Sequence, residues 1–139
     1  MIKKYISNSN ITIIFPSTDD DQYEDFNRLL AQEPSFNIKV TGYDDFIQSI
    51  TNNDFIVTID SLALHIAEKY KKFSLALFSS SSPFALNITD TSYPFSRALD
   101  CCPCSHRYFI PPCKNKMPCT NIDVYDIEHF FSKLQNQAS

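Results

Sequence analysis

The residues best suited to chemistry are five cysteines that lie close together. They all fall within DCCPCSHRYFIPPCKNKMPC, from Asp100 to Cys119, and the rest of the 139-residue chain has none. Four of them follow a C-x2-C-x8-C-x5-C spacing: Cys101, Cys104, Cys113 and Cys119. Four thiolates suit tetrahedral Zn or Fe, and a proline-rich loop can wrap such an ion without regular structure. This pattern predicts a structural metal, with Cys102 pointing away from it.

Two other interpretations of the cysteines stay open. The thiols can be reduced and simply pack a loop, or Cys101 and Cys104 can form a redox pair in a small thiol-redox protein. A thioredoxin-like pair starts a helix directly after a strand, whereas this segment follows a long loop. His106 is expected to be an exposed loop residue rather than a substitute ligand.

A second chemically suggestive segment is TIDSLALHIA, in which a predicted strand runs into a predicted helix. The N–H groups of Ser61, Leu62 and Ala63 would be unpaired at the helix start, where the helix dipole favours an anion such as a diphosphate. His65 lies one turn later and can donate to a phosphate oxygen. The alternative is that Asp60 is only a helix cap and His65 a half-buried helix residue.

These residues are positioned by alternating strands and helices between residues 10 and 79. Apolar, β-branched runs predict strands at 11–15, 36–40, 54–59 and 73–78, and amphipathic patterns predict helices at about 21–31, 43–50 and 61–71. Short links between them imply right-handed crossovers and a parallel sheet. The nearly continuous apolar run 54–59 is expected to be covered on both faces. The fold class is therefore α/β, a Rossmann-like half-domain within a single domain, 1–139.

The rest of the chain has a different character. Residues 80–120 are rich in Ser, Pro and Cys and predict a loop or metal finger. Residues 121–136 predict a C-terminal amphipathic helix.

Composition excludes several functions. The formal net charge of −4 argues against a general affinity for nucleic acid or for an anionic membrane. The single glycine, Gly42, rules out both glycine-rich phosphate-loop motifs. The N-terminus lacks a secretory signal pattern, and no apolar run is long enough to span a membrane. We therefore expect a cytoplasmic chain with no integral membrane span and no nucleic-acid partner.

The segment DFIVTIDSLALHIAEKYKKFSLALFSSSSP resembles the region around the D-[ST]-x-x-x-H-[LI]-A motif of glycosyltransferase family nine, the bacterial ADP-heptose:lipopolysaccharide heptosyltransferases. The upstream Val40-Thr41-Gly42 and the downstream Cys101-Cys102-Pro103-Cys104, Cys113, Cys119 and Ile122 also occupy places typical of that family. The resemblance covers residues 11 to 134.

The resemblance implies the C-terminal, donor-binding lobe of a GT-B fold, with hexosyl or heptosyl transfer in lipopolysaccharide biosynthesis as its activity. It implies no catalytic cofactor. Residues implied for the donor diphosphate are Asp60, Ser61, Leu62, Ala63 and His65. Residues implied for the nucleoside are Thr41, Gly42 and Tyr43, with Asp20 or Asp21 reaching the ribose. A branch of the family, the autotransporter heptosyltransferases, holds an iron in a similar cysteine finger.

Two departures from the family pattern matter. Leu62 stands where the family commonly has glycine, and its side chain can crowd a phosphate. The lobe that carries the family's catalytic carboxylate is absent from this sequence, so the catalytic residues are unknown and the isolated chain is expected to be inactive. A partner chain or a homo-oligomer would supply the missing part.

The alternative is a degenerate lobe that serves as a non-catalytic protein-binding or assembly module. A sheet without its first strand leaves an edge that favours self-association or pairing with a partner's strand.

Overall fold

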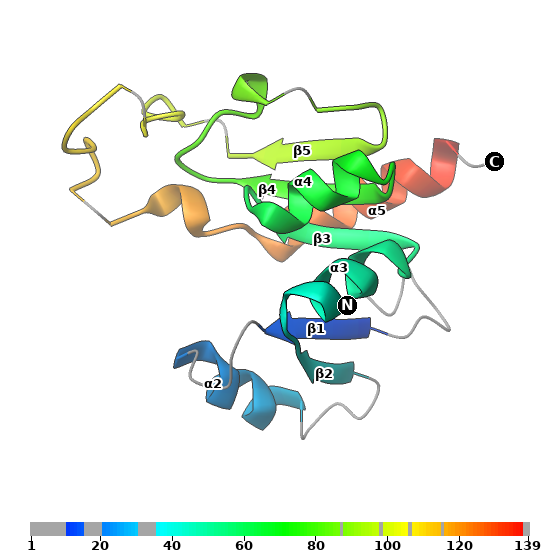
Figure 1. Cartoon of the computed structure of the whole chain (residues 1–139). Helices are drawn as coiled ribbons and strands as arrows, with labels where there is room; N and C mark the ends of the chain where they lie inside the picture. The colour runs from blue at the N-terminus through cyan, green and yellow to red at the C-terminus, as the bar shows by residue number, and fades with distance from the viewer. Residues whose placement is uncertain are drawn as a thin grey trace. The chain divides into compact units, whose positions relative to one another are not determined.

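The computed structural model describes residues 11–15, 21–30, 36–86, 88–97, 99–105, 107–114 and 116–137 (Figure 1). The chain divides into two compact units. One comprises Met1–Gln48 and Glu128–Ser139, here called the terminal unit, and the other is Ser49–Ile127, the central unit. Each is described by itself.

The terminal unit contains a βαβ arrangement. Strand β1 (Ile11–Phe15) is followed by helix α2 (Asp21–Leu30) and strand β2 (Phe36–Val40). The two strands pair in parallel, with Ile11 opposite Phe36 and Phe15 opposite Val40. Both predicted strands are confirmed at their predicted bounds. They could be predicted because a short apolar run ended by turn-forming residues is a local signal for a strand.

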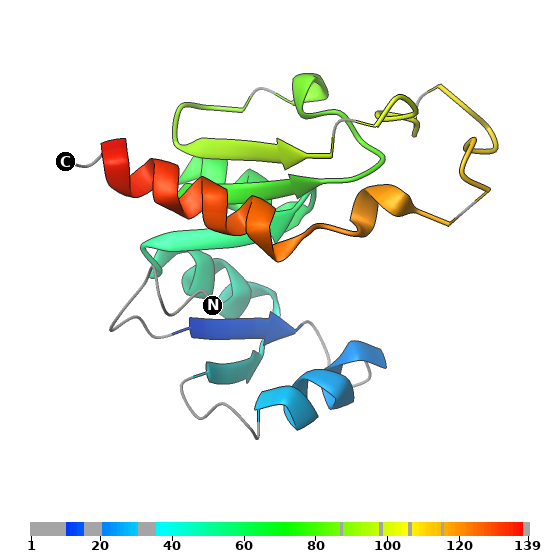
Figure 2. The same ribbon diagram turned by 180° about the vertical axis from the view of Figure 1, so that it is seen from behind.

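The central unit is built on a three-stranded parallel sheet in the order β3-β4-β5 (Figure 2). Helix α3 (Tyr43–Thr51) leads into it, and β3 (Phe55–Ile59) is followed by α4 (Leu62–Lys69) and β4 (Phe73–Phe78). Short 3-10 turns lie at Pro83–Ala85 and Pro118–Thr120, and β5 spans Ser92–Ser96. Helix α5 (Val124–Gln137) begins in the central unit and belongs to the terminal unit from Glu128 onward. The α/β class with a parallel sheet and helices is thus confirmed.

The sheet differs from the prediction in two ways. The four predicted strands are divided between two sheets, β1-β2 and β3-β4-β5. The expectation that β3 is covered on both faces is wrong, since Val57 and Ile59 are exposed. Within the described ranges β3 is an edge strand that pairs only with β4, so its apolar run does not reflect burial on both sides.

Strand β5 was not predicted, because residues 80–120 were expected to form a loop or metal finger. Pro94 lies in the middle of this strand, opposite Ala76 of β4. Proline removes a ladder donor and argues against a central strand, but an edge strand tolerates it. β5 is the edge strand next to β4, so its pairing with β4, and not its own sequence, identifies it as a strand.

The core of the central unit lies between α4 and one face of β4. Leu64, Ala76 and Phe78 are buried together, and Leu86 and Ile88 of the β4–β5 connection pack against them. These β4 residues alternate with Leu75, which is buried on the opposite face. The core therefore fastens α4 to the central strand, and the connection covers it.

A carboxylate also ties α4 to this connection. The Thr89 N–H donates to Glu68 Oε2 at 2.9 Å. Burial raises the pKa of the Glu68 carboxyl, but hydrogen bonds from Ser92 and Thr89 and the nearby imidazole of His65 lower it, and the pKa ends below its ordinary value. Ionised Glu68 therefore stabilises the fold above the ordinary glutamate pKa, and this contribution is lost as the pH falls through the lower, folded-state pKa.

We expect Glu68→Gln to lower the free energy of unfolding by about 1 kcal/mol at neutral pH, because a charge-assisted hydrogen bond is lost. The variant should also lose less stability than the wild type below the ordinary glutamate pKa of about 4.3. Urea unfolding followed by circular dichroism across that pH range measures both effects. Asp90→Asn, at an exposed carboxylate of the same connection, is the control. Parallel pH profiles for wild type and Glu68→Gln would contradict the role of Glu68.

None of the helices in the described part of the chain is both long enough and apolar enough to cross a membrane.

Candidate functional site

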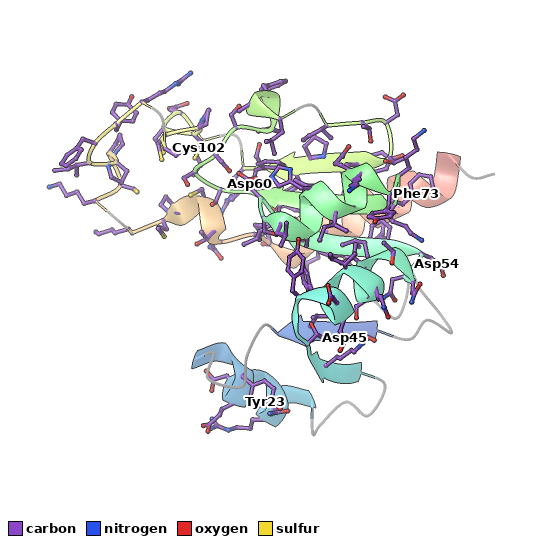
Figure 3. The ribbon with its side chains drawn as sticks, viewed as in Figure 1. Tyr23, Asp45, Asp54, Asp60, Phe73 and Cys102 are labelled. Atoms are coloured by element: carbon purple, nitrogen blue, oxygen red, sulfur yellow. The ribbon has the colours of Figure 1, made fainter. Side chains whose placement is uncertain are left out.

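The carboxyl ends of β3, β4 and β5 lie along one edge of the central unit, here called the carboxyl edge. The strands are parallel, so the residues that follow Ile59, Phe78 and Ser96 come out at the same side. Figure 3 shows Asp60 and Cys102 at this end of the sheet, with Asp54 and Phe73 at the other. In open parallel sheets this edge is where ligands bind.

The start of α4 leaves backbone donors without a side-chain cap. Ser61 is the N-cap residue with an extended backbone (φ −153°, ψ 176°), but its hydroxyl makes no capping hydrogen bond. The hydroxyl lies 3.1 Å from Thr58 Oγ1 instead. The Ser61 carbonyl accepts from the N–H groups of Leu64 and His65. The preceding N–H groups, those of Leu62 and Ala63, are the unpaired donors expected at a helix start.

The structure brings the five residues implied for the diphosphate together, because all of them lie between the end of β3 and the first turns of α4. His65 follows Ser61 by four residues, so both lie on the same face of the helix. Asp60 and His65 are exposed, and Leu62 is 48% exposed. The side chain of Leu62 is therefore available at the surface beside the unpaired donors.

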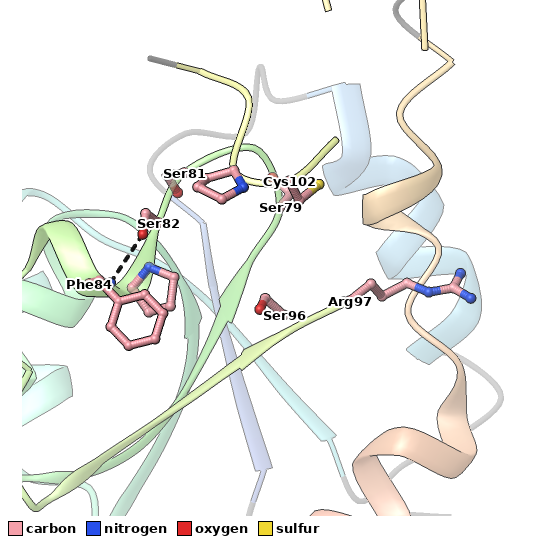
Figure 4. A pocket seen from close by; sticks show the side chains of 9 residues that line it. Ser79, Ser81, Ser82, Phe84, Ser96, Arg97 and Cys102 are labelled. Atoms are coloured by element: carbon pink, nitrogen blue, oxygen red, sulfur yellow. Dashed lines mark hydrogen bonds between the residues drawn. The ribbon is translucent and has the colours of Figure 1, made fainter. Parts of the chain in front are cut away.

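A shallow pocket of about 130 Å³ opens at the carboxyl ends of β4 and β5 (Figure 4). Its lining comprises Ser79, Ser81, Ser82, Pro83, Phe84, Ser96, Arg97, Cys102 and Pro103. Ser82 Oγ accepts from the Phe84 N–H at 3.2 Å. The Arg97 side chain extends away from the serines, and its guanidinium donates to the Asn121 carbonyl at 2.6 Å. The pocket wall therefore combines the hydroxyls of four serines with the apolar surfaces of two prolines and Phe84.

Apart from Cys102 and Pro103 of the cysteine segment, none of these lining residues was singled out by a sequence pattern. The four serines at 79–82 directly follow a predicted strand, so the rule that placed Asp60 at the carboxyl edge applied to them as well. Ser96 and Arg97 could not be found in this way, because β5 was not predicted.

The residues implied for the nucleoside lie in the terminal unit. Thr41, Gly42 and Tyr43 connect β2 to α3, where the Phe46 N–H donates to the Gly42 carbonyl at 2.9 Å. Gly42 and Tyr43 are exposed, whereas the Thr41 hydroxyl is buried and has no hydrogen-bond partner among the described residues. Asp21 is the first residue of α2. Asp20 lies outside the described residues.

The cysteine segment is joined to the carboxyl edge by its backbone. The N–H groups of Cys104 and Ser105 donate to the Ser80 carbonyl at 2.9 and 3.1 Å. Cys104 and Cys119 are buried, and none of the five cysteines forms a disulfide. The segment thus packs onto the sheet through two thiol-bearing residues.

Cys102 does not point away from the other thiols, contrary to the prediction. Burial raises its pKa to about 12, with further contributions from hydrogen bonds and charge interactions with Cys101 and Cys119. A thiol with such a pKa stays protonated at neutral pH, and the thiolate is the nucleophilic form. Cys102 is therefore unsuited to attack a disulfide or a substrate.

The four predicted metal ligands do not come together in a metal-binding arrangement. Across the described ranges, which include all five cysteines, no three His, Cys, Asp or Glu side chains are placed so that they could hold an ion. Structural Zn or Fe at Cys101, Cys104, Cys113 and Cys119 stays a prediction from spacing.

We expect metal-free protein, if the spacing prediction is correct, to bind one Co²⁺ with the absorption of a tetrahedral thiolate site. Cys113→Ser should abolish this absorption and Cys102→Ser should keep it, because only the former is in the predicted set. Titration followed by visible spectroscopy measures both. A chain that gives no thiolate absorption, or a Cys102→Ser variant that loses it, would leave reduced thiols packing the loop.

Comparison of the chain with protein-family models, with curated proteins and with solved structures finds no match. Its function must be argued from the carboxyl edge and its residues.

Proposed function

We propose that the central unit binds the diphosphate of a nucleoside-diphosphate sugar at the start of α4. In this proposal the chain is the donor-binding, C-terminal lobe of a GT-B glycosyltransferase that resembles the bacterial heptosyltransferases, and it is cytoplasmic. One observation supports it most: the first turn of α4 has no side-chain cap from Ser61 and lies at the carboxyl edge of a parallel sheet.

The roles of the residues follow from their charge and hydrogen-bonding groups. The N–H groups of Leu62 and Ala63 would donate to phosphate oxygens, and the helix dipole adds to the attraction. The exposed imidazole of His65 would donate from the next turn. The Asp60 carboxylate repels a phosphate, so we assign it to accept a hydrogen bond from a hydroxyl of the ligand.

The serines beside this helix start fit the same ligand class. β3 and β4 are neighbours in the sheet, and neighbouring strands are about 4.8 Å apart. The hydroxyls of Ser79, Ser81 and Ser82 therefore follow the strand next to the one that leads into α4. Sugar and phosphate oxygens can both pair with such hydroxyls, which donate and accept.

A second candidate is a partner-binding module, and the exposed edge strand β3 favours it. Val57 is 52% and Ile59 63% exposed on a strand that, in the described part of the chain, pairs on one side only. An apolar strand edge is a template for a strand of another chain. The partner would be a second copy of this chain or a chain that carries the other lobe of a GT-B fold.

The donor proposal is tested by calorimetry with ADP and ADP-heptose, with UDP- and GDP-sugars as comparison ligands. We expect Asp60→Ala and His65→Ala each to weaken binding by roughly tenfold or more, the cost of a hydrogen bond to a charged group. Asp54→Ala, at the opposite end of β3, and His129→Ala, on α5, match these changes at exposed positions and should leave the affinity unchanged.

Well-folded protein that binds none of these ligands would contradict the donor proposal. The same conclusion would follow if the variants at residues 54 and 129 weakened binding as much as those at 60 and 65. The partner-binding candidate would then be preferred.

A further inference from the structure

Residues 107–114, 116 and 117 form a projecting loop that no part of the donor proposal uses. Figures 1 and 2 both show this segment, in yellow, extending away from the three-stranded sheet of the central unit. Its tip is apolar and exposed: Phe109 is 104% exposed, Ile110 68% and Tyr108 46%. Three consecutive exposed apolar side chains on a projecting loop, with Phe109 fully exposed, are typical of a surface that contacts something else.

The charge around the tip is positive, although the chain as a whole is acidic. Arg107, Lys114 and Lys116 flank the apolar residues and are exposed. No Asp or Glu occurs between Asp100 and Asp123. Exposed charges are largely screened beyond about 8 Å at physiological ionic strength. The loop therefore presents a local positive field that the net charge of −4 does not cancel.

Part of the loop's backbone is hydrogen-bonded within its own segment. The Tyr108 N–H donates to the Cys104 carbonyl at 3.2 Å, and the Lys114 N–H donates to the Pro111 carbonyl at 2.9 Å. Pro111 and Pro112 carry no N–H at all. Desolvating an unpaired backbone donor is costly. The N–H groups of Phe109 and Ile110 are not among the paired donors, so only shallow insertion, with this backbone still within reach of water and headgroups, is favourable.

From these observations we infer that the projecting loop docks on an anionic phospholipid surface. Phe109 and Ile110 enter the boundary between headgroups and acyl chains, Tyr108 stays at headgroup depth, and the basic side chains pair with lipid phosphates. The complementarity of charge favours an anionic surface over a neutral one. The projection of the loop away from the sheet favours a deformable lipid layer over a protein partner, which would need a matching groove.

The absence of tryptophan from the chain allows a direct test. In Phe109→Trp the new indole is the only one, and its emission reports the polarity around the loop tip. We expect its emission to shift to shorter wavelength with vesicles of phosphatidylcholine and phosphatidylglycerol, and to stay unchanged with phosphatidylcholine alone. Tyr125→Trp, at a 76% exposed position on α5, is the matched control and should show no shift with either.

Co-sedimentation of the full chain with the same vesicles measures the binding affinity and how much each substitution changes it. The double variant Phe109→Ser/Ile110→Ser should weaken vesicle binding by roughly tenfold or more, because the inserted apolar area is lost. Neutralising Lys114 and Lys116 to Gln should cost roughly fivefold per charge, and added salt should act in the same direction. Tyr125→Ser and Lys69→Gln should bind as the wild type does. All substituted side chains are exposed, so thermal unfolding should be unchanged.

Several outcomes would overturn the inference. One is that the wild-type protein does not bind anionic vesicles, and another is that it binds neutral and anionic vesicles equally. A third is an emission shift in Tyr125→Trp equal to that in Phe109→Trp. A dimer, seen by light scattering, that Phe109→Ser/Ile110→Ser dissociates would assign the loop to a second copy of this chain instead. The donor-binding experiment is independent, since none of its variants lies in the loop.

Discussion

Phe78→Ala is expected to destabilise the central unit by about 4 kcal/mol, because it removes a fully buried aromatic side chain and leaves a cavity. Phe78 is buried with Leu64 of α4 and Ala76 of β4. A loss of this size is a large part of the stability of an ordinary domain. Urea unfolding followed by circular dichroism measures it.

Phe84→Ala is the matched control for this prediction. Phe84 is an aromatic residue of the same unit that lies six positions further along the chain and is almost fully exposed. Its loss should change the free energy of unfolding by no more than about 0.5 kcal/mol. Equal effects of the two substitutions would show that the core is not where the structure has it.

The consequence of Phe78→Ala for the proposed site is also measurable. Leu64 lies in the first half of α4, so the cavity forms directly behind the turn that presents the Leu62 and Ala63 N–H groups. Any donor binding should weaken in Phe78→Ala under conditions in which the protein is still folded, although Phe78 itself is buried and contacts no ligand. Donor affinity unchanged in the folded variant would mean that α4 is held in place by other contacts.

The second large effect on the free energy of unfolding is expected at a buried pair of hydroxyl groups between β4 and β5. Ser74 Oγ lies 2.6 Å from Ser92 Oγ, and both residues are buried. Ser74→Ala or Ser92→Ala alone removes the bond between the two hydroxyls, which we expect to cost about 1–3 kcal/mol of unfolding free energy. Ser92→Ala should cost more than Ser74→Ala, because it also removes the hydrogen bond from Ser92 to Glu68. The double variant should cost clearly less than the sum of the two, because no unpaired hydroxyl remains.

The exposed pair Thr89 and Thr91 provides the comparison for this cycle. Their hydroxyls lie 2.8 Å apart in the same connection, but water can replace either partner. Thr89→Ala and Thr91→Ala should therefore be nearly additive and small. Strict additivity at Ser74 and Ser92 as well would mean that the buried pair does not couple the two strands.

Local patterns in the sequence predict most of the secondary structure. The bounds of β1, β2 and β4 were predicted as observed, and the helices at 21–30 and 43–51 differ from their predictions by one residue. The start of α4 was placed at Asp60-Ser61, and Ser61 is its N-cap. These signals are local: β-branched runs, turn-forming residues and helical spacing act within a few residues of each other. The chemistry proposed for Asp60 to His65 depends on this local arrangement and on the place of α4 at the carboxyl edge of the sheet.

Which segments meet depends on long-range packing that no local pattern contains. Because of Pro94, no local pattern predicts strand β5. The proline is tolerated there because β5 lies at the edge of the sheet beside β4. No local pattern predicts the pocket between Ser79 and Arg97 either, because its walls are distant in sequence.

The cysteines show the difference most clearly. Their spacing suggested that Cys101, Cys104, Cys113 and Cys119 form one set, whereas packing places Cys102 beside Cys101 and Cys119. Spacing limits which residues can meet. Which of them do meet depends on how the whole chain buries its apolar side chains and pairs its polar groups, and those contacts are long-range.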